Sequence, residues 1–416
     1  MTNQTAQVKE RDRAPLGASY WKLWTASGLS NLADGVFKIA LPLLAVQITQ
    51  SPTLIAGLTV AATLPWLFFA LTAGALADRL DRRKLMLWAN VSRATLPAVL
   101  AAVILLDFGS IWALYVVALM VGVAETLYDT SAQSILPQMV HRDQLSRANG
   151  RLYAVELTAN QFIGPPLGGL LVATGVVAGL AVPAALWLAA VGGLLLVPGA
   201  FRMEREQKTT LRFDIGEGLR FLWKQKILRT LAVMTGVFNF ASSAAFAVLV
   251  LFAVGPASEM KLSEVGFGLL LTTSALGAFV GSFISERVEA RLGRSRSLTL
   301  TILGVAVFVG APALTNSPYV LGPILFVGGI LIVLWNVITV SLRQRITPNG
   351  LLGRVNSTYR LLAWGTMPLG AAAGGLLAQW LGLQIMFGIM GILTLALLTM
   401  MPILTDKAIA AADVES

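Results

Sequence analysis

The chain is a succession of apolar segments, and this feature limits most strongly how it can fold. A helix needs about 20 apolar residues to cross the core of a bilayer with its backbone groups bonded internally. Only 12% of the 416 residues are charged, against about 25% in a soluble domain. The sequence therefore predicts an all-α polytopic membrane protein with twelve transmembrane helices. We expect them near 20–49, 53–77, 85–106, 110–139, 150–173, 178–200, 228–255, 264–285, 297–315, 318–342, 355–380 and 383–404.

Basic residues are distributed unevenly between the connections. Those after the odd-numbered runs contain one lysine, Lys261, whereas nearly all other Lys and Arg residues follow the even-numbered runs. Basic loops stay on the cytoplasmic side, so we expect both termini in the cytoplasm, with the protein in a bacterial inner membrane. The net charge of +10 is then a topology signal. It does not indicate nucleic acid as a partner, because short loops do not provide a groove-sized basic surface.

The longest hydrophilic segment divides the chain into two similar halves. LSRAN at 145–149 recurs as LGRVN at 352–356, and GGLL at 168–171 recurs at 374–377. Parallel repeats of this kind are an established architecture of secondary transporters, so we expect two pseudo-symmetric bundles of six helices. The expected domains are a cytoplasmic tail (1–19), a first bundle (20–200), a cytoplasmic linker (201–227), a second bundle (228–404) and a cytoplasmic tail (405–416).

The linker combines apolar and basic side chains. Phe213, Leu219, Leu222 and Trp223 alternate there with basic residues. This pattern predicts an amphipathic helix that lies on the inner leaflet. The alternative is a merely solvated linker.

Composition argues against an enzyme. The chain has no cysteine and a single histidine, His141, which leaves little from which to build a metal centre or a nucleophile–base pair. It also lacks the GxxxxGK[ST] phosphate-binding loop, so ATP is not its direct energy source. We expect no catalytic residues, no cofactor and no metal site.

Ionisable side chains inside the apolar runs are the candidate functional residues, because charge at bilayer depth is costly. The second half has almost none, so proton chemistry is expected in the first half. The candidates are Asp34 and Lys38 in the first run, Arg93 in the third, Glu125 and Asp129 in the fourth, and Glu156 in the fifth, together with the amides Asn31 and Asn160.

Their spacing suggests pairs. Asp34 and Lys38 are four residues apart on one helix face and can form an ion pair. Glu125 and Asp129 repeat the spacing with two acids, whose repulsion in a buried place favours a proton on one of them. We therefore expect Asp34 or Glu125 to carry a coupling proton. Two structural alternatives stay open: Asp34 and Lys38 as a static pair, and Arg93 paired with Asp129 or Glu156 to hold the bundle.

Two motifs carry a family resemblance. GALADRLDRRK at 74–84 is similar to the loop signature of the major facilitator superfamily, from which it departs at Asp81. GPPLGG at 164–169 is similar to the motif of that superfamily's antiporters, and its prolines should kink the helix. The segments 148–156, 216–229 and 345–360 resemble the branch of macrolide-efflux and enterobactin-exporter proteins. The matching residues are Gly74, Asp78, Arg79, Arg82 and Arg83 in the loop, and Gly164, Pro165, Gly168 and Gly169 in the antiporter motif.

The resemblance implies a secondary active transporter that works by alternating access. It implies a monomeric, proton-coupled exporter of drug-like or siderophore-like molecules, and the many aromatic residues favour an amphiphilic or lipophilic substrate. The alternative is a flippase of lysophospholipids or other lipids, which that branch also contains. The loop at 74–84 would be a conformational latch, or else only a cytoplasmic anchor. The buried arginine that many proton-coupled drug antiporters carry in helix 4 is absent from 110–139.

Overall fold

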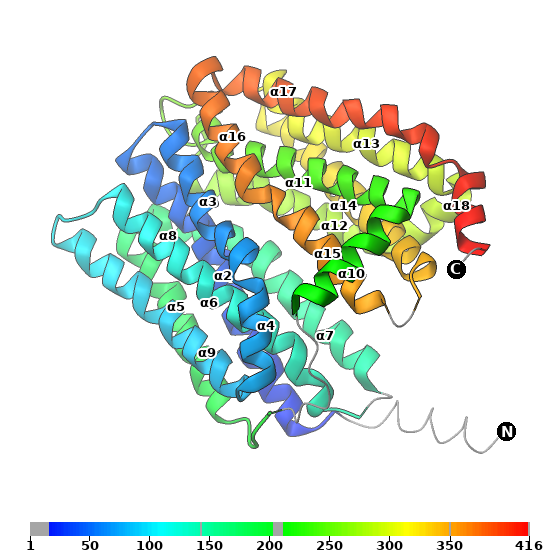
Figure 1. Cartoon of the computed structure of the whole chain (residues 1–416). Coiled ribbons are helices and arrows are strands. Elements are labelled where there is room, and N and C mark those ends of the chain that lie inside the picture. Colours follow the sequence, from blue (N-terminus) through cyan, green and yellow to red (C-terminus); the bar gives the residue numbers. More distant parts are fainter. Residues whose placement is uncertain (1–15, 142–143, 203–210, 349–350, 415–416) are drawn as a thin grey trace. The chain divides into compact units, whose positions relative to one another are not determined.

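The structure is a computed structural model that describes residues 16–141, 144–202, 211–348 and 351–414 (Figure 1). These residues form helices joined by short connections. No β-strand occurs within the described ranges, where Val254 and Leu262 make an isolated parallel bridge. The prediction of an all-α membrane protein is confirmed.

Ten stretches of helix among the described residues are long and apolar enough to cross a bilayer. Each corresponds to one of the runs predicted from the sequence. They are formed by α2 (Ala18–Ile48), α5 (Arg82–Leu105), α6 (Ile111–Ile135) with η1 (Leu136–Gln138), α9 (Val176–Leu195), α11 (Lys226–Ala253), α12 (Glu264–Leu292), α13 (Arg294–Gly310) with η4 (Ala311–Ala313), α14 (Pro318–Ile346), α15 (Leu352–Trp364) with α16 (Thr366–Leu381), and α17 (Leu383–Leu395) with η5 (Ala396–Ile403).

The other two predicted runs are helical but interrupted. Residues 53–77 fall in α3 (Pro52–Phe68) and α4 (Ala70–Arg79). Residues 150–173 fall in α7 (Leu145–Leu157), the π-helix η3 (Thr158–Ile163) and α8 (Gly164–Thr174). Pro165 and Pro166 have no backbone N–H, so the carbonyls one turn earlier cannot be bonded in the α-helical way. The chain widens into a π-helix at that turn, a feature that frequently marks functional sites.

The described residues form two compact units. The first comprises those of Met1–Leu44 and Phe68–Glu206, and the second those of Ala45–Leu67 and Gln207–Ser416. Helix α3 belongs to the second unit, where the Ser51 hydroxyl donates to Gln379 Oε1 at 3.0 Å. These contacts group part of the predicted bundle 20–200 with the second unit. The predicted domain boundaries remain a prediction.

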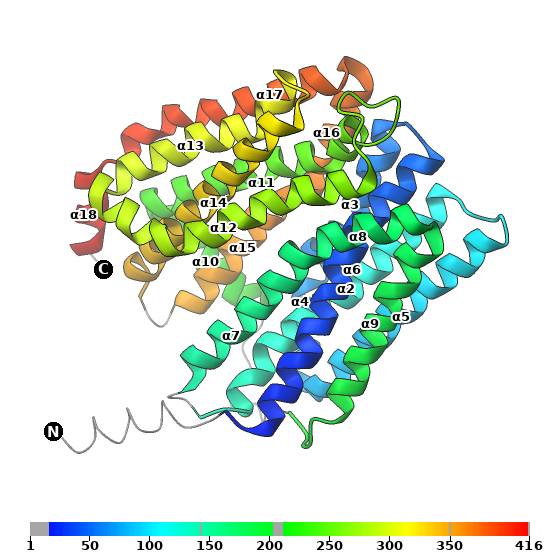
Figure 2. The same ribbon diagram turned by 180° about the vertical axis from the view of Figure 1, so that it is seen from behind.

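Within each unit the helices pack in pairs, as the two views in Figures 1 and 2 show. In the first unit α5 lies between α6 and α9. In the second unit α12 packs on α14, α11 on α16, and α13 on both α14 and α17. The antiparallel neighbours bury small and apolar side chains between them and leave large apolar ones, such as Trp88 and Trp380, exposed. Large exposed apolar side chains suit a protein whose surface faces lipid.

Glycines bring the backbones of two helices together in each unit. In the first unit a Cβ added to Gly35 of α2 would come within 2.3 Å of Asn160 O, and one on Gly168 of α8 within 2.8 Å of Val36 O. The second unit repeats this between α11 and α16, where a Cβ on Gly374 would come within 2.5 Å of Ala244 O. Gly168 and Gly374 occupy equivalent places in the two GGLL repeats. Small residues at such crossings let helices pack without intervening side chains.

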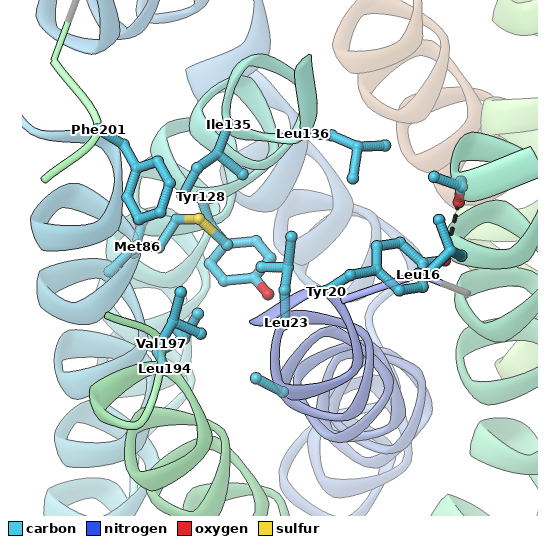
Figure 3. Packing of buried hydrophobic residues seen from close by; sticks show 14 residues of the cluster. Leu16, Tyr20, Leu23, Met86, Tyr128, Ile135, Leu136, Leu194, Val197 and Phe201 are labelled. Carbon is cyan, nitrogen blue, oxygen red and sulfur yellow. Dashed lines mark hydrogen bonds between the residues drawn. The ribbon is translucent and has the colours of Figure 1, made fainter. Parts of the chain in front are cut away.

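An apolar cluster closes one end of the first unit (Figure 3). Residues of α2, α5 and α6 pack there against the chain that follows α9, up to Phe201. The Tyr20 hydroxyl donates to Ala148 O at 3.0 Å and so fastens α7 to α2. The cluster fixes the ends of the helices that carry the buried charges. Its larger members are Leu16, Tyr20, Leu23, Met86, Tyr128, Ile135, Leu136, Leu194, Val197 and Phe201.

Helix α10 (Leu211–Lys224) lies within the predicted linker and packs on α15. A Cβ on Gly218 would overlap Arg354 O, and Glu217 forms an ion pair with Arg354. Leu222 is fully buried while Trp223 is half-exposed, so the helix has one apolar face covered and a second apolar side chain free. The Phe213 side chain lies outside the described residues. The placement of α10 on the inner leaflet stays a prediction.

The glycine contact beside Asn160 gives a test of this packing. We expect Gly35→Ala to lower the free energy of unfolding by about 1–3 kcal/mol, because the added methyl group overlaps a backbone carbonyl that cannot rotate away. Gly192→Ala in α9 is the matched control, since a Cβ there meets no atom within 4 Å. The measurement is the thermal unfolding midpoint of the purified protein. Equal midpoints for the two variants would contradict the packing described.

Candidate functional site

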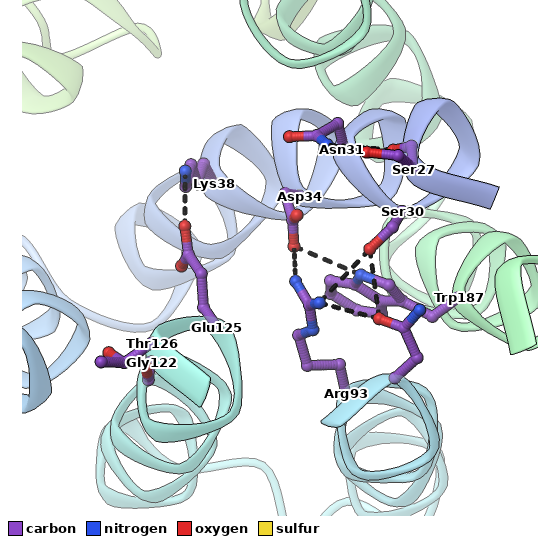
Figure 4. Close-up of polar contacts among 11 residues, drawn as sticks. Ser27, Ser30, Asn31, Asp34, Lys38, Arg93, Gly122, Glu125, Thr126 and Trp187 are labelled. Atoms are coloured by element: carbon purple, nitrogen blue, oxygen red, sulfur yellow. Dashed lines mark hydrogen bonds and ion pairs between the residues drawn. The ribbon is translucent and has the colours of Figure 1, made fainter. Parts of the chain in front are cut away.

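A buried ion pair links α2 to α5 in the first unit (Figure 4). Arg93 Nη1 lies 2.7 Å from Asp34 Oδ1, and the same oxygen accepts a hydrogen bond of 3.2 Å from Trp187 Nε1 on α9. The Asp34 side chain is 4% exposed and the Arg93 side chain is 0% exposed. Three helices therefore meet at one carboxylate oxygen.

The second terminal nitrogen of Arg93 is also held, whereas its buried Nε has no hydrogen-bond partner among the described residues. Its Nη2 donates to Asn90 Oδ1 at 2.7 Å and to Ser30 Oγ at 3.3 Å, and its plane lies 4.4 Å from the centre of the Tyr128 ring. Arg93 is the twelfth residue of α5, near the middle of that helix. A buried ion pair is tolerated when such hydrogen bonds satisfy its charges, and the loss of one partner then leaves the other charge uncompensated.

A second ion pair joins α2 to α6. Lys38 Nζ lies 3.0 Å from Glu125 Oε1, with the Lys38 side chain about half-exposed and that of Glu125 18% exposed. The alternatives considered from the sequence, Asp34 with Lys38 and Arg93 with Asp129 or Glu156, are not the pairs that form among the described residues. Asp34 and Glu125 each bind a cation on another helix instead, because the long side chains of Arg93 and Lys38 reach across to them.

A polar cavity of about 150 Å³ lies beside these pairs. It is lined from α2, α6, α7 and η3, all in the first unit. Seven of the eight residues predicted for the cavity contribute to its wall, and the eighth, Arg93, binds Asp34 from outside the lining. The lining residues are Asn31, Asp34, Lys38, Glu125, Asp129, Tyr153, Glu156, Leu157, Asn160 and Gln161.

The π-helix supplies one wall of the cavity. Asn160 and Gln161 belong to η3, directly before the antiporter motif. Gly164 and Gly168 pack against α2, and Pro165 is buried, as is Gly169. The motif thus positions two amide side chains next to the face of α2 that carries Asp34.

Some residues of the site were missed by sequence reasoning. Trp187 lies in the run 178–200, which contains no charge, and Ser30 and Asn90 are ordinary polar residues of a helical run. The only available signal was that a buried tryptophan needs an acceptor for its indole N–H. That rule does not name the acceptor, so Asp34 could not have been assigned.

The second unit holds a smaller polar cluster. The hydroxyl groups of Thr235 and Tyr359 are 2.6 Å apart, and Trp335 Nε1 donates to Thr235 at 3.1 Å. Arg343 Nε donates to Asn356 Oδ1 at 2.6 Å, and its guanidinium lies 4.2 Å from the Tyr359 ring centre. The acids of the first unit have no counterpart in this cluster.

The charged loop between α4 and α5 binds helix ends of its own unit. Arg82 donates to Ser134 O of α6 at 2.6 Å, and Arg83 donates to Leu194 O and Leu195 O of α9 at 2.9 and 2.8 Å. These carbonyls lie in the last turns of their helices, where they lack partners along the helix. Cations are also favoured at this negative end of the helix dipole.

The departure from the family signature has a structural role. Asp81 is the N-cap of α5: its Oδ1 accepts from Lys84 N at 3.1 Å, and its Oδ2 accepts from Phe201 N at 3.1 Å. Of the other motif residues, Arg79 is exposed, and a Cβ on Gly74 would meet no described atom within 4 Å. The Asp78 side chain lies outside what the structure describes. The latch therefore stays a prediction.

Metal ligands do not gather at this site. Among the described residues no group of three or more His, Cys, Asp or Glu side chains could hold a metal ion. What the cavity offers is a set of hydrogen-bonding oxygens next to two ion pairs. Such a set can bind a polar group or exchange a proton.

The Asp34–Arg93 pair gives a test of the site. We expect Arg93→Met to lower the free energy of unfolding by about 3–5 kcal/mol, because it leaves a carboxylate buried without its cation. The double variant Asp34→Asn/Arg93→Met should recover part of this loss. Arg79→Met, at an exposed arginine, is the control and should be neutral. Thermal unfolding midpoints decide, and additive losses in the double variant would rule out the pairing.

Comparison with known proteins places the chain in a family. Residues 12–416 match the family model described as "Transmembrane secretion effector". The chain is 29% identical over 343 residues to the enterobactin exporter EntS of Shigella boydii serotype 4 (strain Sb227), which covers 81% of this chain and 80% of that protein. It is 30% identical over 372 residues to the multidrug efflux pump Tap of Mycolicibacterium fortuitum, which covers 85% and 88%.

Solved structures have the same fold at low sequence identity. The nucleoside transporter NupG matches with a TM-score of 0.71 and 14% identity over 92% of this chain and 99% of that one. A bacterial homologue of the iron transporter ferroportin, in an inward-facing state, matches with a TM-score of 0.70 and 17% identity over 96% and 100%. With the helical membrane fold, the loop motif and the match over nearly its whole length, the chain belongs to the transmembrane secretion effector family of the major facilitator superfamily and is a membrane transporter, not an enzyme.

Proposed function

We propose that this transporter exports an amphiphilic small molecule from the cytoplasm by alternating access, driven by proton entry. The observation that carries the proposal is the polar cavity of about 150 Å³ beside the buried Asp34–Arg93 pair. Charge at this depth is costly and is retained in transporters where it binds substrate or protons. The relatives support export: one is named an enterobactin exporter and another a multidrug efflux pump.

Asp34 is the residue that we propose for proton exchange. Its Oδ1 is occupied by Arg93 and Trp187, whereas no described group donates to Oδ2, and the residue lines the cavity. A proton can therefore arrive on Oδ2 from the cavity. Its arrival cancels the carboxylate charge, which frees Arg93 from its ion pair and changes the forces between α2, α5 and α9. Glu125, bound to Lys38, remains the second candidate.

The overall setting follows the sequence predictions. We propose a monomer in a bacterial inner membrane. The uneven distribution of basic residues supports the placement of both termini in the cytoplasm. The substrate binds in the cavity and exchanges with protons across the lipid bilayer. The motif Gly164, Pro165, Gly168 and Gly169 keeps the cavity wall against α2 during the cycle.

The function is tested by drug accumulation in an efflux-deficient bacterial host that expresses the protein. Enterobactin, a macrolide and a fluorescent lysophospholipid are compared, with and without a protonophore. Export of enterobactin or the macrolide that stops with the protonophore supports the proposal. Movement of the lysophospholipid alone would favour the flippase, and no proton dependence for any compound would reject proton coupling.

Asp34→Asn tests the proton site. We expect this variant to lose proton-driven efflux by at least about tenfold, because the amide cannot take up and release the proton. Exchange of the same compound across the membrane without a proton gradient should persist, since the amide oxygen can still accept hydrogen bonds from Arg93 and Trp187 and so keeps this wall of the cavity in place. Glu286→Gln, at an exposed acid of α12, is the control. If Asp34→Asn and Glu125→Gln both retain proton-coupled efflux, neither residue carries the proton.

We also propose that Gly74, Asp78 and Arg79 act as the conformational latch, with Arg82 and Arg83 as its fixed base. The support is that Arg82 and Arg83 bind carbonyls of α6 and α9 and Asp81 caps α5, whereas Arg79 is exposed.

The latch predicts different results for two variants. Asp78→Asn should keep expression and the unfolding midpoint but lower efflux several-fold, because it removes only a state-dependent contact. Arg83→Ala should lower the unfolding midpoint, because two carbonyls at the end of α9 lose their donor. Efflux assays and thermal unfolding on the same preparations distinguish the two. Full efflux by Asp78→Asn would dismiss the latch.

A further inference from the structure

The polar cavity offers mainly oxygens that accept hydrogen bonds. Four of its lining residues are acids, and one, Lys38, is a base. Lys38 is bound to Glu125, and Arg93 neutralises Asp34 from behind the wall. Asp129 and Glu156 form no ion pair within 4 Å among the described residues. The lining therefore has two acidic side chains in excess of the cations that pair with it.

Two deeply buried side chains add free acceptor atoms. Asn31 is 6% exposed, and its Nδ2 donates to Ser27 O and Oγ at 2.9 and 3.3 Å. Its oxygen points away from Ser27 in Figure 4, and no described group donates to it. Asp34 likewise keeps Oδ2 without a donor. Both residues line the cavity, and these two oxygens are not among the buried atoms without a partner, so they are accessible to a donor that arrives with a ligand.

From these observations we infer that the cavity binds an organic cation with several N–H donors, such as a guanidinium or primary ammonium group of the transported molecule. The inference rests on the proposed function, because it names the substrate class of the same site. A guanidinium presents N–H donors in a plane and pairs with carboxylates, so inside this cavity it can donate to the acids Asp129 and Glu156 or to the open oxygens of Asn31 and Asp34. A bare metal ion does not fit, since the described residues provide no metal-binding group.

Lys38 occupies part of this acidic site as a built-in cation. Its half-exposed side chain can turn away from Glu125, whereas Arg93 is fully enclosed. An incoming cation and Lys38 therefore compete for Glu125. Removal of the Lys38 charge should therefore strengthen cation binding, whereas a substitution that merely disrupts the cavity should weaken it.

The test measures equilibrium binding to the full chain in lipid nanodiscs by ligand-observed NMR titration. The probes share one ring and differ in charge: phenylguanidinium, its neutral isostere phenylurea, and benzenesulfonate. We expect phenylguanidinium to bind about tenfold more tightly than phenylurea, a difference of about 1.4 kcal/mol. Benzenesulfonate should bind most weakly. Equal or tighter binding of phenylurea or benzenesulfonate overturns the inference.

Variants tie the preference to the cavity. The double variant Asp129→Asn/Glu156→Gln should abolish the preference for phenylguanidinium. Each single substitution should reduce the preference about threefold, and the single variants provide the test if the double variant does not fold. Lys38→Met should tighten phenylguanidinium binding about threefold. Glu286→Gln, an acid exposed on α12, should change nothing. A preference that survives the double substitution would place the cation elsewhere and overturn the inference.

The result separates this inference from the proposed function. Binding at equilibrium needs no proton gradient and no transport. Selective cation binding without proton-dependent efflux would reject the proposed export and leave the inference standing. Proton-dependent efflux by a protein that prefers the neutral or anionic probe would reject the inference and leave the proposed export standing.

Discussion

The cost of burying charge in hydrocarbon governs the first unit of this transporter. Asp34 and Arg93 are almost wholly enclosed, so each must be matched by partners, and four further side chains, one each from α2, α5, α6 and α9, contact the pair. The pair consequently fixes how these helices pack against one another. The protonation state of the Asp34 carboxylate therefore affects helix packing, because any change in its charge alters contacts on three helices at once.

The two units use similar backbones for different chemistry. Both bring a glycine-rich helix against its neighbour, α8 on α2 and α16 on α11, at equivalent places in the repeats. In the part of the chain that the structure describes, the first unit combines this crossing with buried acids and a polar cavity. The second unit has aromatic rings, hydroxyl groups and one stacked arginine, Arg343, in its polar cluster. Duplication therefore explains the common packing, and substitutions inside the helices explain the division of roles.

Much of the fold follows from the sequence because bilayer-spanning helices are specified by apolar length alone. The two interrupted runs show the limit: the prolines of GPPLGG predict a disturbance, but not that it takes the form of a π-helix over Thr158–Ile163. Which residues line the cavity could be predicted from the ionisable residues inside the apolar runs, since such residues face the interior of a helix bundle. The ion-pair partners could not be predicted, because the Arg93 side chain is long enough to reach several of the acids. The placement of α5 beside α2 is what selects Asp34.

The contact between Gly35 and the π-helix has a consequence for how motion spreads. With no side chain between the two backbones, sliding of α8 along α2 cannot be absorbed by a change of rotamer. A shift at Gly164 would press directly on the backbone of Gly35, the residue that follows Asp34. A bend in the proline-containing helix would therefore move the backbone that carries Asp34 with it.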